Sequence, residues 1–142
     1  MKVFPAGEGF LIRLMKGEEI HESLTAYAAE HGITGATVSG IGAVRNVEVG
    51  FFDTGTRTYV RQEINENTEL LSLTGNLCLR EGRPFLHAHV ILMKSDFSVC
   101  GGHLFRGEIS VTGEFAVRQA DLSLIRSWDE TVGLDLLEAG EQ

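Results

Sequence analysis

Three of the five histidines have a spacing that suits metal binding. His87 and His89 are two residues apart in an apolar run, and alternate residues of an extended strand share one face. His103 follows Gly101 and Gly102, whose missing side chains allow another backbone to approach closely. Three imidazoles with an open position are typical of catalytic zinc sites. The pattern therefore predicts that these histidines bind zinc or another divalent transition metal ion.

The histidines and cysteines of this sequence could also have roles other than metal binding. Strand histidines can also be structural groups that hydrogen-bond to carboxylates. His21 and His31 belong to a predicted helix, where we expect them at the surface or near its carboxyl end. Cys78 and Cys100 are expected to be small core residues, although Cys100 could serve as a soft metal ligand. The sequence has no Cys-x-x-Cys, Gly-x-Ser-x-Gly or phosphate-binding loop, so it offers no support for those site classes.

A catalytic metal would need acid–base and substrate-binding partners. Glu69 or Glu114 could act as the general base. Arg13, Arg45 or Arg83 could bind a substrate carboxylate. These candidates define one hypothesis, a metal-dependent enzyme of the lyase or hydrolase class that acts on a small anionic molecule.

One helix and many short strands are predicted to position these residues. The strongest helical pattern begins at Glu18 and ends near Gly32. Its apolar stripe, at helical spacing, consists of Ile20, Leu24, Tyr27 and Ala28. Residues 9–14 and most of 35–117 read as strands separated by turns. The pattern predicts an α+β fold in which the helix covers one face of an antiparallel sheet.

The predicted domain spans residues 1–142, with a core over 9–128 and an acidic tail over 129–142. Beyond Ala120 the pattern is weaker: residues 122–128 fit either a short strand or a helix, and residues 134–137 could pack as a last turn. The second face of the sheet is expected to need partner strands or another subunit.

Charge and composition narrow the class of protein. The net charge is −8, and no cluster of lysine and arginine offers a surface for neutralising phosphates. No apolar run reaches the length of a membrane span, so we expect no membrane partner. Two cysteines are too few for a disulfide framework, which favours a reducing, cytoplasmic location.

Several segments together resemble the plants-and-prokaryotes conserved (PPC) domain. They are residues 69–76, 84–90 and 101–104, with support from 13–18, 39–43 and Arg126. The resemblance implies an antiparallel sheet with one packed helix, assembled as a homotrimer and similar to the acetolactate decarboxylase-like fold, whose namesake is a three-histidine metal enzyme. It also implies zinc binding at His87, His89 and His103, and a DNA-binding or regulatory role. The sequence lacks the AT-hook of the plant proteins, so we expect weak DNA binding at best.

Overall fold

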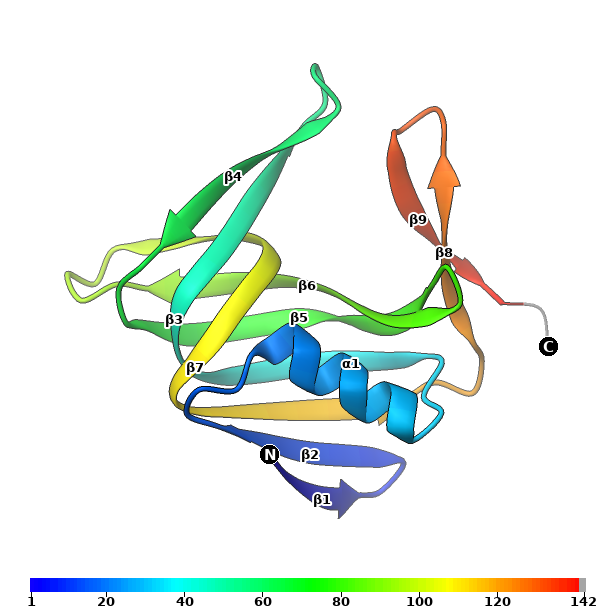
Figure 1. The fold of residues 1–142 in the computed structure, drawn as a ribbon, viewed down its shortest axis with the longest axis horizontal. Helices are drawn as coiled ribbons and strands as arrows, with labels where there is room; N and C mark the ends of the chain where they lie inside the picture. The colour runs from blue at the N-terminus through cyan, green and yellow to red at the C-terminus, as the bar shows by residue number, and fades with distance from the viewer. Residues whose placement is uncertain (141–142) are drawn as a thin grey trace.

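The computed structural model describes residues 1–140, which form one helix and nine strands (Figure 1). Their bounds are β1 Lys2–Ala6, β2 Gly9–Met15, α1 Ile20–Glu30, β3 Ala36–Asp53, β4 Thr58–Ile64, β5 Thr68–Arg80, β6 Arg83–Met93, β7 Val99–Gln119, β8 Leu124–Asp129 and β9 Leu134–Ala139. The strands form one sheet in the order β1-β2-β7-β3-β5-β8-β9, while β4 pairs with β3 and β6 pairs with both β5 and β7. The predicted α+β class is confirmed.

The sheet is mixed rather than purely antiparallel. Every strand pair is antiparallel except β5 with β8, where Leu79 faces Ile125 and Arg80 faces Arg126. This parallel contact is only two residue pairs long, so local sequence pattern gives little sign of it. It nevertheless decides where the chain beyond residue 120 lies.

Helix α1 confirms the predicted apolar stripe. Its core-facing side chains are buried and pack on β6 and β7: Ile20, Leu24, Tyr27 and Ala28. Glu19 caps the amino end, because its carboxylate accepts a hydrogen bond of 2.7 Å from the backbone N–H of Glu22. Within residues 1–140 no helix is both long enough and apolar enough to cross a bilayer.

Two hairpins, β3–β4 and β8–β9, project from the sheet toward the same side of the molecule (Figure 1). Their tips are linked, since Arg57 Nη1 donates to the carbonyl oxygen of Glu130 at 3.3 Å. The space between these hairpins is where the candidate site lies.

Part of the expected acidic tail, Leu134–Ala139, instead forms strand β9, which pairs with β8. The turn between them forms because the Asp129 carboxylate accepts from the N–H groups of Thr131 and Val132 at 2.8 and 2.9 Å. Gly133 then adopts φ +79°, a conformation that favours glycine. The end of the predicted tail, with Glu141, lies outside the described residues.

Candidate metal centre

The structure brings His87, His89 and His103 together. On β6 the neighbours Leu86 and Ala88 point into the core, so both histidines face the other side of the strand. His89 lies directly opposite His103 in the β6–β7 ladder. The ring centroids are 5.1 to 5.5 Å apart, and one nitrogen of each ring lies within 4.8 Å of the other two. Strand alternation correctly predicted this shared face.

The two glycines before His103 are needed because backbones meet there. A Cβ atom at Gly101 would lie 2.1 Å from the carbonyl oxygen of Val90. A Cβ atom at Gly102 would lie 2.7 Å from the carbonyl oxygen of Gly50. Any larger residue would therefore push β7 away from its neighbours, and the close backbone approach predicted from the two glycines is confirmed.

The protonation state of the cluster suits a metal ion. Burial, helped by the charges of Arg126 and His89, lowers the pKa of His87 to about 4. Burial, followed by the charges of His87 and His89, lowers the pKa of His103 to about 4. Both rings are therefore neutral at physiological pH, which is the form that ligates metals.

His103 also has a buried polar atom with no partner. The residue is only 8% exposed, and its Nδ1 has no hydrogen-bond partner among the described residues. An unpartnered buried nitrogen is costly unless something else satisfies it. Three imidazoles, one of them with an orphaned nitrogen, fit the donor set that zinc and related divalent ions prefer.

Arg126 of β8 reaches the cluster from a distant part of the chain. Its Nη2 lies 2.8 Å from His87 Nδ1, and its Nη1 donates to the carbonyl oxygen of Asp135 at 2.9 Å. The parallel contact of β8 with β5 places it there. In the sequence, Arg126 stands out only through the family resemblance, because nothing in its local sequence links it to the histidines.

A cavity of about 680 Å³ adjoins the three histidines, between the β3–β4 and β8–β9 hairpins. Its aromatic lining comprises Phe52, Tyr59, Phe85, Phe105 and Trp128. Its charged lining comprises Arg61, Arg80, Arg126 and Asp135. Arg61 stacks 3.8 Å over the Phe105 ring, and Arg80 forms an ion pair of 2.7 Å with Asp135. The volume is typical of small-molecule sites.

His21 also lines this cavity, so its expected surface position was wrong. Its ring is half-buried, and its Nε2 lies 3.2 Å from the carbonyl oxygen of Leu104, to which it donates. His31 is exposed beside the carboxyl end of α1, as expected, and stacks on Tyr27. Helical periodicity separates core from non-core positions, but it cannot distinguish open surface from the rim of a cavity.

The cysteines contribute nothing to the histidine cluster of the described residues. Cys78 is fully buried, as expected, and burial raises the pKa of its thiol. Cys100 is half-buried and does not belong to the cluster. The candidate ligands are therefore all imidazoles.

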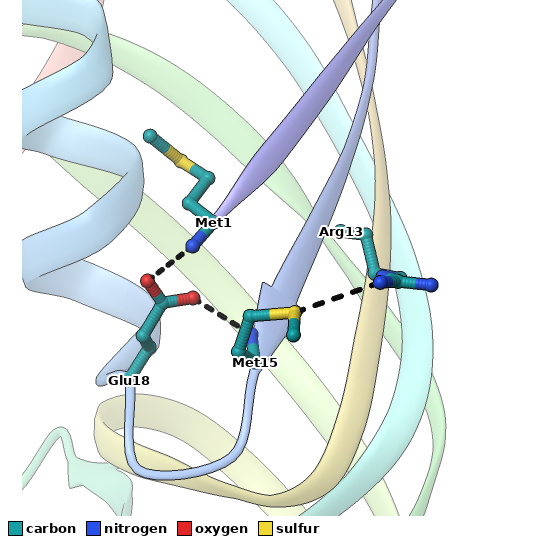
Figure 2. A network of polar contacts seen from close by, with 4 residues as sticks. All are labelled: Met1, Arg13, Met15 and Glu18. Atoms are coloured by element: carbon teal, nitrogen blue, oxygen red, sulfur yellow. Dashed lines mark hydrogen bonds and ion pairs between the residues drawn. The ribbon is translucent and has the colours of Figure 1, made fainter.

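The residues proposed for substrate binding lie elsewhere. Arg13 and Glu114 face each other on β2 and β7 and line a separate groove of about 590 Å³. Figure 2 shows Arg13 beside Met15, whose sulfur lies 3.7 Å from Arg13 Nη2, with Glu18 nearby. Neither Arg13 nor Glu114 lines the cavity beside the histidines.

The remaining three candidates also lie outside the lining of the cavity beside the histidines. Arg45 forms an ion pair with Glu108, and Arg45 and Glu69 line another hollow of about 370 Å³. Arg83 is exposed at the start of β6. None of the five candidates lines the cavity beside the histidines, and the acid–base and substrate-binding roles expected for them stay predictions.

Comparison with known proteins agrees with this architecture. A Pyrococcus horikoshii plant- and prokaryote-conserved (PPC) protein is 32% identical, with a TM-score of 0.86 over 99% of this chain and 96% of its own. A metal-containing protein from Archaeoglobus fulgidus is 39% identical, with a TM-score of 0.84 over 96% and 98%. A Bacteroides thetaiotaomicron protein, whose name proposes DNA binding, is 28% identical, with a TM-score of 0.91 over 96% of each chain.

Curated protein sequences give no significant match. The family described as the Plants and Prokaryotes Conserved (PCC) domain matches residues 1–121. This match spans most of the sheet, helix α1 and all three clustered histidines. The chain therefore belongs to the Plants and Prokaryotes Conserved domain family.

Proposed function

We propose that this protein binds one divalent transition metal ion per chain, zinc first among them, through His87, His89 and His103. The observation that carries the proposal is the convergence of three imidazoles from paired strands, one of which has an unpartnered buried nitrogen. The metal-containing relative from Archaeoglobus fulgidus supports it. When bound, such an ion supplies Lewis acidity to the adjoining cavity.

Elemental analysis tests the proposal on protein purified without a histidine tag and supplemented with zinc. We expect about one equivalent of zinc per chain and a loss of most of it in His89→Ala, because removing one of three ligands greatly lowers the affinity of the site for zinc. His31→Ala is the matched control, since His31 is exposed and lies outside the cluster. Zinc far below one equivalent, or equal zinc in both variants, contradicts the proposal.

A second candidate function is metal-dependent chemistry on a small anion. It is favoured by the cavity beside the histidines, where exposed His89 and the guanidinium of Arg126 line the same space. The aromatic walls limit water near the cluster, and Arg126 can hold a negative group there. A zinc-dependent turnover of a small carboxylate that is lost in His89→Ala supports this function, whereas turnover unchanged in that variant refutes it.

DNA is at most a weak ligand of this chain in our proposal, although the names of two relatives propose DNA binding. The net charge of −8 opposes phosphate binding. Three arginines that could contribute to a cationic surface already have partners within the chain. Arg45 and Arg61 form ion pairs with carboxylates, and Arg57 donates to a backbone carbonyl.

Assembly as a homotrimer is part of the same proposal. Ile91 is 49% exposed between the buried Val90 and Leu92, and Val111 is 68% exposed on β7. Leu11 and other apolar side chains line the groove of about 590 Å³. Contact with a second subunit would remove this apolar surface from water.

The cysteines support a cytoplasmic location. Cys78 and Cys100 are both free. Free thiols persist in a reducing compartment. We therefore place the protein in the cytoplasm.

A further inference from the structure

The hydrogen bond between Arg126 and His87 restricts what His87 can do. A guanidinium can only donate, so His87 Nδ1 must be the acceptor across the 2.8 Å contact. In a neutral imidazole the proton then resides on Nε2. The one lone pair of this ring is therefore already used by Arg126.

Metal binding at His87, which rests on the proposed function, must break this hydrogen bond. If Nδ1 is the ligand, the metal takes the lone pair that Arg126 uses. If Nε2 is the ligand, its proton moves to Nδ1, and two donors then face each other. In both cases Arg126 Nη2 loses its acceptor.

The freed group has no other anionic partner nearby. Among residues 1–140 the Arg126 side chain forms no ion pair with a carboxylate. The Asp135 carboxylate is already paired with Arg80, and only the Asp135 backbone oxygen accepts from Arg126 Nη1. Arg126 Nε is buried and has no hydrogen-bond partner among the described residues either.

The two unsatisfied donors lie on one edge of the guanidinium. Nε and Nη2 together form a fork that matches the two oxygens of a carboxylate. The adjoining cavity offers aromatic rings for the rest of such a ligand, among them Phe85, Phe105 and Trp128. A dication beside Arg126 would also leave an excess of positive charge that an anion neutralises.

We propose that Arg126 exchanges His87 for a ligand carboxylate when a metal ion occupies the histidine cluster, so that the cavity binds a small carboxylate with an apolar body in a metal-dependent way. Metal and carboxylate are then coupled through one hydrogen bond. Arg126 opposes metal binding in the absence of the carboxylate and favours it in its presence.

Benzoate is a suitable probe, and benzamide is its uncharged counterpart. By calorimetry, zinc-loaded protein should bind benzoate at least about tenfold more tightly than metal-free protein, as expected for a charge-assisted hydrogen-bonded pair. Benzamide should show no such dependence. Equal benzoate binding with and without zinc overturns the proposal.

Arg126→Gln separates the proposal from a purely structural role. We expect this variant to bind zinc several-fold more tightly than the parent, since His87 is no longer occupied, and zinc-loaded variant to bind benzoate about tenfold more weakly. A structural role for Arg126 would weaken both. Arg61→Gln is the matched control, because Arg61 lines the same cavity but pairs with Glu48 and makes no contact with His87 or Asp135. It should leave the affinity for zinc within twofold.

A measurement on the parent protein makes the test independent of whether the variants fold. Ring ¹⁵N spectra of metal-free protein should show His87 with an unprotonated Nδ1, and a protonated Nδ1 overturns the proposal. Failure of the parent to bind zinc overturns the metal function and this inference together. Zinc binding with unchanged zinc and benzoate affinities in Arg126→Gln overturns the inference alone.

Discussion

Gly101→Ala should damage both the fold and the histidine cluster. The added Cβ would lie 2.1 Å from the carbonyl oxygen of Val90, which is 0.9 Å short of the 3.0 Å below which real Cβ contacts are essentially never found. The obstructing atom belongs to the backbone of β6, so no side-chain rotation relieves the contact. The strands must separate where Gly101 pairs with Ile91, two positions from the pair of His89 and His103.

The size of the effect follows from this displacement. Overpacking a close contact costs about 1–3 kcal/mol, and we expect the free energy of unfolding to fall by this amount. A metal site needs its ligands placed within about 0.5 Å, which is less than the required strand movement. The affinity for zinc should therefore fall about 10- to 100-fold, as for other changes that disturb the orientation of ligands.

Urea unfolding followed by circular dichroism measures the first effect, and competition with a chromophoric chelator measures the second. Gly55→Ala is the matched control, because the nearest atom to its Cβ would be the mobile Asp53 carboxylate at 3.2 Å. Its unfolding free energy should stay within about 0.5 kcal/mol of the parent. If Gly101→Ala behaves like Gly55→Ala in both assays, the close backbone approach does not hold the cluster in place.

Three further outcomes are expected. In metal-free protein the unfolding free energy should fall as the pH drops from 6.5 to about 4, because the unfolded chain protonates His87 and His103 before the folded chain does. Urea unfolding midpoints measured across this pH range check the prediction, and midpoints that do not change with pH contradict it. Fluorescence anisotropy with random duplex DNA at physiological salt should give a dissociation constant above about 1 μM, since non-specific affinity depends on neutralised phosphates. Light scattering should give about three times the chain mass of 15.5 kDa, and a mass near 15.5 kDa would reject the trimer.

Local periodicity was enough to predict the parts of the site that are close in sequence. Alternation along β6 placed His87 and His89 on one face, and the two glycines indicated how closely the β7 backbone approaches its neighbours before His103. The stripe of α1 likewise identified a buried face. These features depend only on the repeat of a strand or helix and on the size of one side chain.

The contribution of distant segments could not be predicted in the same way. Arg126 is 39 residues from His87, and a parallel contact of two residue pairs brings them together. The turn that starts β9 rests on the Asp129 carboxylate and Gly133, a signal that the acidic composition of this region obscured. The five charged candidates for acid–base and substrate-binding roles were chosen by residue type alone, and residue type does not determine which edge of a sheet a side chain occupies.

The strands that carry the histidines are paired with their neighbours more extensively than the hairpin that carries Arg126. This difference matters for the proposed exchange of partners by Arg126. His89 and His103 lie in a ladder where β6 pairs with β7 on one side and, over eleven residue pairs, with β5 on the other. The β8–β9 hairpin that carries Arg126 has two residue pairs with β5, together with the ion pair of Arg80 and Asp135. Segments with few ladder connections open at lower free-energy cost than the central strands. The guanidinium can therefore leave His87 for a ligand without any change in the strands that hold the histidines together.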